Sequence, residues 1–570
     1  MPRKTAFRQS LRAVLLVLKE QVFPWWVSEE KTLAWLGMII LIILSLLSVY
    51  VAVIFNNWSR DFYNTIEQKN LNAFLHQVVI FIPLFLLLLF DFCSRSYLTA
   101  WLSFRWRRWS TVQLQNTWLS NKNFYKIPLL SKEMDNPDQR ISQDIREVCY
   151  GTIAIFLSFF REGVNFITFS IILWNLSRAF DFKIASLTLH IPGLLVWMAI
   201  LYSLIGTVFI FKIGGPIIDL DRIQEKREAN FRYGLMRIFE RREEIATLGG
   251  EAVEEEFLQG TFLELTKNYY QILKRQIYIN LFQNFYRNAS MFVPLFLVGP
   301  LYFKNIITMG VLMQAQGMFG EVNTSLSSLM TEFNTIAGVL ASFKRLIAFH
   351  ALMETSHHPV RDLKTSNSEL HISSLTIRTP SNQKIWISPE LLLKPGDRKV
   401  LMAPSGTGKT SFLRVISGIY PYVDGDRITL TQEAMIIPQR PYMPVGTLRQ
   451  CLLYPTPESN LETQDITEEI LLSLMKNTFL EHLIPWLHQR DDYQNRLSLG
   501  EQQRINFLRV LLKKPRWLFM DEPFSQLNKE YIQSLLNLLT NTLSSSGIFI
   551  VSHQEIVGFE KIPLPQDSSL

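Results

Sequence analysis

The stretch Ala403-Pro404-Ser405-Gly406-Thr407-Gly408-Lys409-Thr410-Ser411 decides the fold of the C-terminal part of this 570-residue chain. It follows an apolar run at 399–402, which predicts a buried strand, and it precedes a run at 412–416 that predicts a helix. A strand, a glycine-rich turn, Lys-Thr and a helix, in this order, predict a phosphate-binding loop. The alternative is an ordinary Gly/Ser turn between a strand and a helix.

Each residue type in this stretch has a chemical reason. Gly406 and Gly408 let backbone N–H groups converge on phosphate oxygens without a Cβ in the way. The helix that follows points the positive end of its dipole at the anion. Lys409 can reach the β- and γ-phosphates, and the hydroxyl of Thr410 can bind Mg²⁺. The loop therefore predicts ATP as ligand and Mg²⁺ as cofactor.

An acidic pair ends a second apolar run, Trp517-Leu518-Phe519-Met520. Beside a phosphate-binding loop, Asp521 can hold Mg²⁺ and Glu522 can polarise a water for attack on the γ-phosphate. The alternative is an acidic strand end without a catalytic role.

Leu497-Ser498-Leu499-Gly500-Glu501-Gln502-Gln503-Arg504 precedes that run. Ser498 and Glu501 have the spacing of a capping box that opens a helix at 501–512. A helix N-terminus with a serine and a glycine is also a ready phosphate site. The two interpretations are compatible.

The N-terminal part is apolar enough for a membrane domain. The chain has 48% hydrophobic residues, 40 Phe and 13 Trp. Six segments have about the 20 residues that a membrane span requires: 33–55, 74–92, 152–175, 191–211, 281–303 and 306–330. The fifth and sixth are the most polar, and Phe303-Lys304-Asn305 predicts a tight turn between them.

The net charge of +7 comes mostly from basic residues that flank the apolar segments, so topology explains it better than nucleic-acid binding. Basic residues concentrate before the first span and in the two long loops. The alternate loops carry only Arg60, Lys69, Arg178, Lys183 and Lys304. This bias predicts that both termini are cytoplasmic, with no nucleic acid among the partners.

We divide the chain into an N-terminal interfacial segment (1–30), a six-helix transmembrane domain (31–350), a linker (351–369) and a nucleotide-binding domain (370–570). In residues 1–20, basic residues surround an apolar helical face, which suits a helix in the membrane interface. An organelle presequence is the alternative. Cys93, Cys149 and Cys451 follow no metal or disulfide spacing, so we expect free thiols.

Together, the stretches 403–411, 497–504 and 517–522 resemble the Walker A, signature and Walker B motifs of ABC transporter ATPases. Gln439 in Ile436-Ile437-Pro438-Gln439-Arg440 is similar to the Q-loop, and His553 in Ile550-Val551-Ser552-His553 is similar to the switch histidine. The resemblance implies an exporter-like helical membrane domain, extended into the cytoplasm, followed by an α/β ATPase domain. It also implies that Gln439 contacts Mg²⁺ and, with His553, senses the γ-phosphate.

The resemblance further implies a head-to-tail pair of ATPase domains, so that a half-transporter acts as a homodimer. ATP would lie between the Lys409 loop of one copy and Ser498, Leu499, Gly500 and Glu501 of the other. Two polar cytoplasmic stretches, Asn136–Asp144 and Glu243–Gly250, are expected to dock on the ATPase domains and transmit their closure. The alternative is that they are solvated helical faces.

A narrower resemblance, to subfamily D and its bacterial branch, covers nearly the whole chain. It rests on Pro438–Pro455, the LSLGEQQR signature, Asn136–Ile141, Glu244–Ala246, the segment at 57–63 and the segment at 310–315. Some members of this branch import vitamin B12, bleomycin or antimicrobial peptides, and the resemblance implies a bacterial inner membrane as the location. The solute implied is peptide-like, cobalamin-like or amphipathic and lipid-like; its identity and direction of movement stay open.

Three features depart from the family pattern. Ala403 replaces the first glycine of the loop, and Asn528 replaces an aspartate after the Walker B motif. The region Thr376–Pro380 holds no aromatic residue to stack on adenine, and Trp386 is out of register. These departures motivate a second hypothesis, a membrane-anchored ATPase that regulates a partner without moving a solute.

The sixth span carries a stripe of small and polar residues at helical spacing: Gln314, Gly317, Glu321, Ser325, Ser328 and Glu332. A carboxylate at membrane depth is costly, so Glu321 should face protein or water. We expect Gln314, Glu321, Ser325 and Ser328 to line a solute path near Asn284, Arg287 and Asn288. The alternative is that the stripe only packs helices together.

Overall fold

The computed structural model describes most of the chain. The described residues are 23–130, 137–178, 182–184, 187–189, 192–355, 361–362, 369–379, 381, 383–403, 407–420, 422–424, 428–429, 434–456 and 466–563. The expected interfacial helix before residue 23 and most of the expected linker lie outside them. Two compact units form: residues 1–115 with 136–349, and residues 116–135 with 350–570. The four-segment division expected from the sequence stays a prediction.

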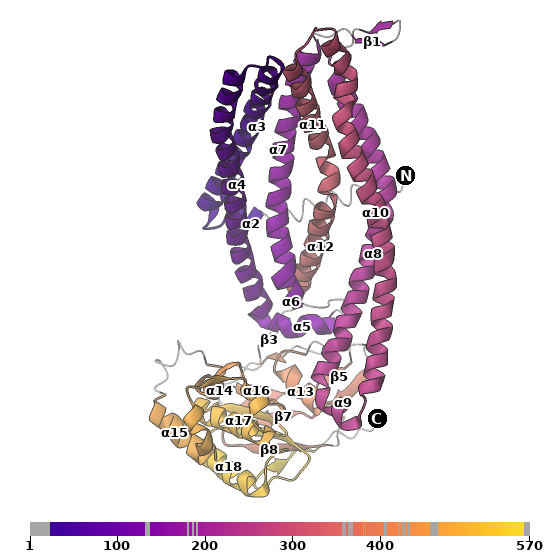
Figure 1. The fold of residues 1–570 in the computed structure, drawn as a ribbon. Helices are drawn as coiled ribbons and strands as arrows, with labels where there is room; N and C mark the ends of the chain where they lie inside the picture. Colours follow the sequence, from indigo (N-terminus) through magenta and orange to yellow (C-terminus); the bar gives the residue numbers. More distant parts are fainter. Residues whose placement is uncertain are drawn as a thin grey trace. The chain divides into compact units, whose positions relative to one another are not determined.

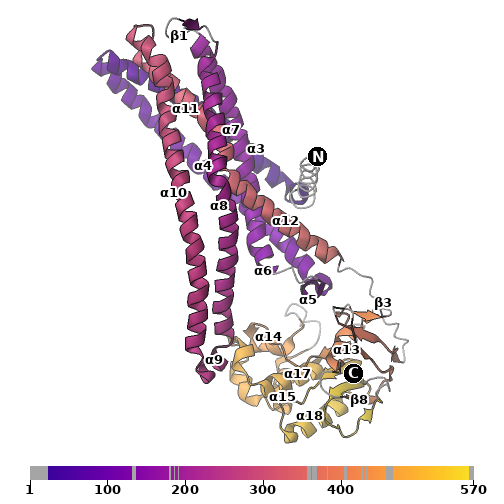
Figure 2. The same ribbon diagram turned by 90° about the vertical axis from the view of Figure 1, so that its right-hand side faces the viewer.

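The first unit consists of long helices (Figure 1). Its elements are α2 (Phe23–Trp26), α3 (Lys31–Glu67), α4 (Leu71–Leu119), α6 (Pro137–Gln139), the π-helical turn η3 (Arg140–Asp144), α7 (Ile145–Arg178), β1 (Phe182–Ile184), β2 (Leu187–Leu189), α8 (Leu194–Glu240), α9 (Arg242–Leu248), α10 (Glu251–Phe303), α11 (Met309–Thr331) and α12 (Phe333–Thr355). Figure 2 shows α8 and α10 side by side down to α9, which joins them.

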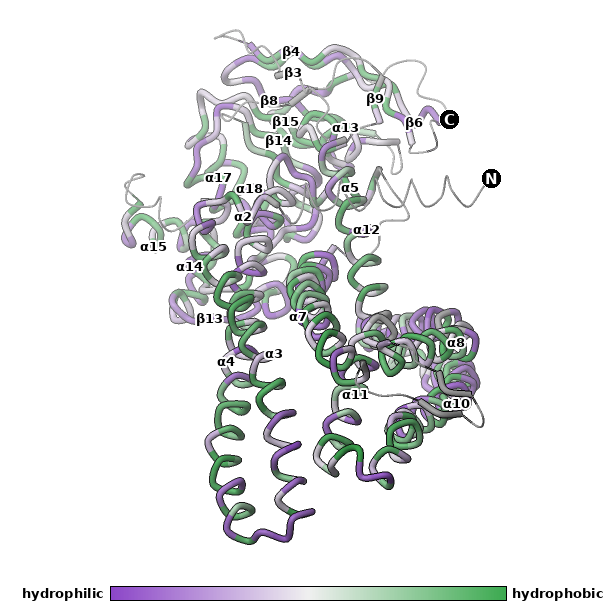
Figure 3. The backbone as a smooth tube through the Cα atoms, turned by 90° about the horizontal axis from the view of Figure 1, so that it is seen from above, coloured by the Kyte–Doolittle hydropathy of each residue, from purple (hydrophilic) through white to green (hydrophobic). Residues whose placement is uncertain are grey.

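Each of the six predicted spans coincides with a helix: α3, α4, α7, α8, α10 and α11. The predicted tight turn is confirmed, since Asn305 N–H donates to the Tyr302 carbonyl at 2.9 Å. By length and apolar composition, five described helical stretches could cross a membrane: Lys31–Glu67, Leu71–Leu129, Pro137–Ser177, Leu194–Glu240 and Thr335–Glu354. The helices at the fifth and sixth predicted spans are therefore too polar for this criterion, and α12 meets it instead. In Figure 3, α4 is hydrophobic along most of its length, and the turn to α3 is hydrophilic.

The core of this unit lies where α7, α8, α10 and α11 meet. Helix α11 contributes Leu312, Ala315, Phe319 and Val322, which lie at helical spacing on one face. The other face of α11 approaches α3 closely. A Cβ on Gly310 would lie 2.1 Å from the Arg60 carbonyl oxygen, and one on Gly317 would lie 2.6 Å from Asn56 Nδ2. These glycines are needed because the two helices pack closely.

The second unit is an α/β domain around a five-stranded parallel sheet. Its strands lie in the order β11 (Ala434–Ile437), β14 (Trp517–Asp521), β15 (Gly547–Ser552), β8 (Arg398–Met402) and β16 (Glu560–Lys561). Smaller strands are β3 (Arg361–Asp362), β4 (Leu370–Ile372), β5 (Thr376–Arg378), β6 (Lys384–Ile387), β7 (Leu391–Leu393), β9 (Val423–Asp424), β10 (Ile428–Thr429), β12 (Gly446–Thr447) and β13 (Arg490–Asp491).

Helices cover both faces of the sheet. Helix α13 (Lys409–Ile416) packs on the face that carries Phe519 and Phe549. Helices α17 (Leu499–Lys513) and α18 (Lys529–Thr542) pack on the opposite face. The remaining helices are η2 (Ser120–Lys122), α5 (Asn123–Leu130), α14 (Leu448–Leu453), α15 (Glu468–Asn477), η5 (Glu481–Trp486) and α16 (Tyr493–Arg496).

Candidate functional site: a phosphate-binding loop and a polar membrane cavity

The predicted phosphate-binding loop connects β8 to α13, as expected. Pro404, Ser405 and Gly406 lie outside the described residues. Gly408 is the N-cap of α13, with φ +100°, a left-handed conformation that favours glycine. A Cβ there would lie 3.3 Å from Ile385 Cγ2 and from Trp386 Cβ. Gly408 is therefore required both by its backbone conformation and by the strand β6 beneath it.

Lys409 begins α13, and its side chain is buried at the mouth of the loop. Its ammonium donates to the Ala403 carbonyl and lies 3.3 Å from Nδ1 of His553. Burial lowers the pKa of Lys409, while the nearby carboxylates of Glu522 and Asp521 act in the opposite direction. The lysine, the switch histidine and both acidic residues thus share one small region.

Asp521 and Thr410 are neighbours, as a shared metal site requires. Asp521 ends β14 and is 3% exposed. Burial raises the pKa of Asp521, and hydrogen bonding to the Thr410 side chain opposes this shift. One hydroxyl and one carboxylate side by side fit Mg²⁺, which commonly binds one or two protein oxygens together with phosphates.

The Glu522 carboxylate contacts both Gln439 and His553, the two residues that we expected to sense the γ-phosphate. Its Oε2 accepts from Gln439 Nε2 at 2.9 Å, and its Oε1 lies 2.8 Å from His553 Nε2. Its backbone has φ +46°, which is uncommon for a residue with a side chain. Gln439, Glu522, His553 and Lys409 therefore form one continuous chain of contacts.

The signature stretch folds as the predicted capping box. Ser498 is the N-cap of α17; its hydroxyl accepts from Glu501 N–H at 3.3 Å, and Ser498 N–H donates to Glu501 Oε2 at 2.9 Å. Burial alone would raise the pKa of Glu501, but hydrogen bonds from His482 and Ser498 outweigh it and lower the pKa. The Leu499 side chain is exposed.

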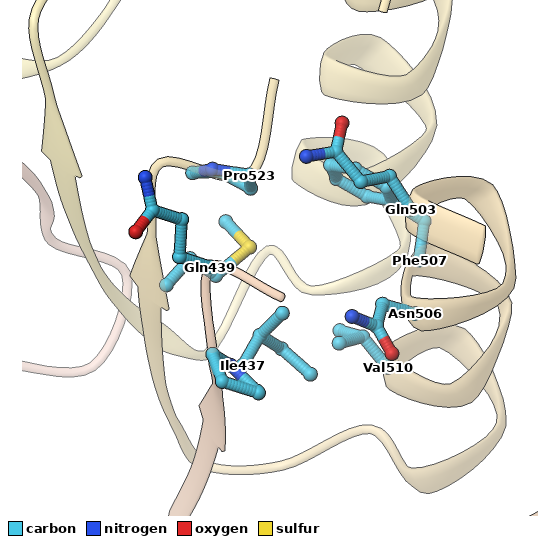
Figure 4. Close-up of a pocket in the computed structure, with 9 residues that line it drawn as sticks. Ile437, Gln439, Gln503, Asn506, Phe507, Val510 and Pro523 are labelled. Atoms are coloured by element: carbon cyan, nitrogen blue, oxygen red, sulfur yellow. The ribbon is translucent and has the colours of Figure 1, made fainter. Parts of the chain in front are cut away.

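A glutamine that we did not predict joins this helix to the loop after β14. Gln503 is 4% exposed; it donates to Ser525 Oγ at 3.0 Å and accepts from Gln526 N–H at 3.2 Å. With Ile437, Gln439, Phe507 and others, it lines a cavity of about 10 Å³ between β11, α17 and the end of β14 (Figure 4). Its position directly after Gln502 in the signature stretch is the sequence feature from which we could have predicted this role.

The structure shows where Ala403, Asn528 and Trp386, the residues behind the departures from the family pattern, lie. Ala403 is buried beside the Lys409 ammonium. Asn528 is the N-cap of α18 and makes no side-chain capping hydrogen bond. Trp386 is 3% exposed, and its ring lies 6.2 Å from Phe412, edge to face. Trp386 is thus a core residue and offers no exposed ring for adenine.

The first unit contains a cavity of about 820 Å³ with a mixed polar and apolar lining. Residues from α3, α7, α8, α10 and α11 line it. Its charged lining residues are Arg161, Glu162, Arg287, Glu321 and Glu332, and its larger apolar and aromatic ones are Tyr63, Ile210, Phe282, Tyr286, Met291 and Met313. Arg161 and Glu162 form an ion pair at 2.6 Å, so they are an internal pair.

The predicted path residues divide between two roles. Glu321 and Ser328 line the cavity, and Asn165 Nδ2 donates to Glu321 Oε2 at 3.3 Å. Gln314 does not line it; Gln314 Nε2 donates to Asn57 Oδ1 on α3 at 2.8 Å.

Ser325 is also absent from the lining and donates to Glu162 Oε2 at 3.0 Å. Arg287 lines the cavity, whereas Asn284 and Asn288 do not. The stripe on α11 therefore both packs against helices and faces the cavity.

Both expected docking stretches belong to the first unit, and their docking on the ATPase domains stays a prediction. Residues 137–144 belong to the first unit, where Arg345 NH2 lies 2.5 Å from Asp144 Oδ1. Residues 243–250, spanning α9, also belong to the first unit. Residues 116–135, which we did not single out, belong to the ATPase unit.

A helical membrane unit in one chain with a P-loop ATPase unit of this geometry defines a fused ABC half-transporter. Residues 18–303 match the family described as ABC transporter transmembrane region 2, and residues 388–525 match the family described as ABC transporter. The chain belongs to the ABC transporter family, as an integral membrane protein with an ABC-type ATPase domain.

Among its relatives, the inner membrane ABC transporter ATP-binding protein YddA of Escherichia coli is 30% identical, over 93% of each chain. The chloroplastic ABC transporter D family member 2 of Arabidopsis thaliana is 29% identical, over 93% of this chain and 82% of that one. The human lysosomal cobalamin transporter ABCD4 is 24% identical, over 98% and 94%.

A solved structure, a bacterial Atm1-family ABC exporter with ATP bound, has a similar fold. Its TM-score is 0.66 at 16% identity, over 93% of this chain and 92% of that one. The exporter-like fold expected from the sequence is therefore confirmed.

Proposed function

We propose that two copies of this chain form an ATP-driven transporter that moves a solute through the cavity of the membrane units. The observation that carries the proposal is the arrangement of Glu522, whose carboxylate contacts Gln439 and His553 beside Lys409. A carboxylate fixed at a strand end next to a phosphate-binding lysine is suited to accept a proton from an attacking water.

In this mechanism Lys409 and the N-terminus of α13 bind the β- and γ-phosphates. Thr410 and Asp521, with Gln439, hold Mg²⁺, which neutralises charge on the phosphate oxygens when bound. His553 orients the Glu522 carboxylate. Ser498, Leu499, Gly500 and Glu501 complete the site of the partner copy, because a helix N-terminus attracts phosphate.

We infer the solute class from the cavity lining. The lining contains carboxylates and guanidinium groups as well as aromatic and methionine side chains, which suits an amphipathic solute: peptide-like, cobalamin-like or lipid-like. One relative is named a lysosomal cobalamin transporter, which supports testing cobalamin first. We further propose that both termini are cytoplasmic, from the distribution of basic residues, and that the membrane is a bacterial inner membrane, as the name of the Escherichia coli relative suggests.

Transport in reconstituted vesicles tests the proposal. ATP-dependent accumulation of labelled cobalamin or a labelled peptide is expected for the wild type and should be lost in Glu522→Gln. The regulatory hypothesis is favoured by a different result: ATP hydrolysis that no tested cobalamin, peptide or acyl compound stimulates, with no accumulation. Chemical cross-linking of the purified protein tests the homodimer.

A further inference from the structure

The carboxylate of Glu501, in the first turn of α17, has a second partner besides Ser498. Its Oε1 lies 2.6 Å from Nε2 of His482, which belongs to η5. Its Oε2 accepts from the Ser498 N–H at 2.9 Å and from the Ser498 hydroxyl at 2.7 Å. The contacts therefore run from η5 through Glu501 to the serine that we expect to contact the ATP of the partner copy.

His482 is the hydrogen-bond donor in this pair. Burial alone would raise the pKa of Glu501, but the hydrogen bonds from His482 and Ser498 lower it, so the carboxylate is ionised at neutral pH. An ionised carboxylate has no proton to donate and can only accept. Nε2 of His482 therefore carries the hydrogen, whether the imidazole is neutral or protonated.

Buried neighbours hold His482 at this place. Leu480 and Leu483, on either side of it, are fully buried and pack in one core cluster with Ile505 of α17. The His482 side chain is 50% exposed, against 18% for that of Glu501. The backbone of η5 is thus fixed against α17, while the imidazole lies at the surface beside the signature stretch.

The Ser498 hydroxyl has one hydrogen, so it can donate to one acceptor at a time. In the structure that acceptor is Oε2 of Glu501. In the proposed dimer the acceptor would be a γ-phosphate oxygen of the ATP that the partner copy binds. The Glu501 carboxylate therefore competes with the phosphate for this hydrogen, and its negative charge also repels the phosphate.

A donor on the other oxygen of the same carboxylate reduces both effects. The hydrogen of His482 Nε2 attracts negative charge toward Oε1, so Oε2 becomes a weaker acceptor for the Ser498 hydroxyl. The same hydrogen bond fixes the rotamer of Glu501, which keeps the Ser498 N–H bonded and the capping box closed. The helix N-terminus thus keeps its shape when the hydroxyl changes its acceptor.

We propose that His482 is a positioning residue, which donates to Glu501 and so lets the Ser498 hydroxyl turn to the γ-phosphate bound by the partner copy. His482 itself contacts neither ATP nor the attacking water in this mechanism. The inference rests on the proposed function, since the hydroxyl of Ser498 has such a target only in an ATP-bound dimer. It adds a residue outside the signature stretch to the ATP site.

The first test compares His482→Ala and His482→Gln with wild type in the full chain. A hydrogen bond to a charged group at a half-exposed position contributes about three- to ten-fold, so the kcat for ATP hydrolysis should fall by that factor in His482→Ala. His482→Gln keeps an N–H donor and should restore at least half of the wild-type kcat. The Tm should change by no more than about 2 °C in either variant, which separates positioning from a loss of stability.

His488→Ala is the matched control. His488 is an exposed histidine of the same unit, and its Nε2 lies 3.4 Å from a different carboxylate, Glu468. This variant should hydrolyse ATP at the wild-type rate. In a Glu501→Gln background, His482→Ala should lower kcat no further, because the charged acceptor is already gone.

The second readout is the release of labelled ATP from dimers that carry Glu522→Gln. Adding His482→Ala should speed this release about three- to ten-fold, because the contact of Ser498 with the γ-phosphate is weakened, whereas adding His488→Ala should leave it unchanged. A wild-type kcat in His482→Ala, an equal loss in His488→Ala, or an equal further loss in the Glu501→Gln background would each overturn the proposal. If the wild-type chain itself fails to dimerise or to hydrolyse ATP, the proposed function fails instead, so the two failures are distinguishable.

Discussion

Replacing Glu522 by Gln tests the centre of the ATP site with the smallest change in shape. In the wild type, one carboxylate oxygen of Glu522 accepts a hydrogen bond from Gln439, and the other oxygen contacts His553. An amide has one oxygen and one NH₂ group, so it can accept from only one of these partners. The variant therefore loses the proton acceptor and, unless His553 changes tautomer, one hydrogen bond.

The two losses have very different sizes. General base catalysis contributes about 10²- to 10⁴-fold, so hydrolysis should fall by that factor, which equals about 3 to 5 kcal/mol in the barrier. One hydrogen bond contributes about 1 kcal/mol to stability, or about 2 to 4 °C in Tm. The backbone at residue 522 stays in the left-handed region in both cases, so its strain cancels.

Phosphate release by purified protein in lipid nanodiscs measures the effect, and labelled-ATP retention shows whether nucleotide still binds. Glu555→Gln is the matched control, because Glu555 is an exposed carboxylate two residues after His553. We expect loss of hydrolysis, retained ATP binding and ATP-bound dimers for Glu522→Gln, and wild-type behaviour for the control. Wild-type hydrolysis in Glu522→Gln would refute Glu522 as the base.

Three further predictions concern Gly408, Asp521 and Glu321. Gly408→Ala should lower the Tm of the nucleotide-free ATPase unit by about 2 to 8 °C, since a left-handed alanine costs about 1 to 2 kcal/mol and its Cβ would press on Ile385 and Trp386; an unchanged Tm in thermal unfolding would contradict this. Burial raises the pKa of Asp521, so the stability linked to this group is present below its unfolded pKa and is lost as pH rises through the folded pKa. Asp521→Asn should therefore raise the nucleotide-free Tm at pH 7 and abolish the added stabilisation by Mg·ATP, as read by thermal unfolding. Glu321→Gln should change the rate of ATP-dependent solute uptake while basal hydrolysis stays within about twofold; wild-type uptake at equal expression would remove Glu321 from the solute path.

The sequence predicted the helical segments of the membrane unit well, because an apolar run of about 20 residues by itself indicates a helix that spans the membrane. The sequence did not show which polar residues of α11 line the cavity and which contact neighbouring helices. Gln314 and Glu321 look alike on a helical wheel, yet one donates to Asn57 on α3 and the other lines the cavity. The side that a polar residue faces depends on which helix packs beside it, and this is a property of the tertiary fold.

The assignment of residues 116–135 shows the same limit. They belong to the ATPase unit, which no local sequence pattern indicated, whereas the two polar stretches that match a family pattern belong to the first unit and their docking stays a prediction. Lys122 was one basic residue among many near the ends of spans. Its ammonium donates to the Ser417 carbonyl, 295 positions away, and no local pattern reports such a contact.

By itself, the sequence determined the chemistry of the ATP site: a lysine, a threonine, an aspartate, a glutamate, a glutamine and a histidine, each next to a predicted strand or helix end. Only the tertiary structure decided that these residues meet. The strand order β11-β14-β15-β8 does not follow the chain, yet it brings Gln439, Glu522, His553 and Lys409 to one edge of the sheet. The carboxyl ends of parallel strands share an edge, and side-chain packing on both faces selects which strands are neighbours.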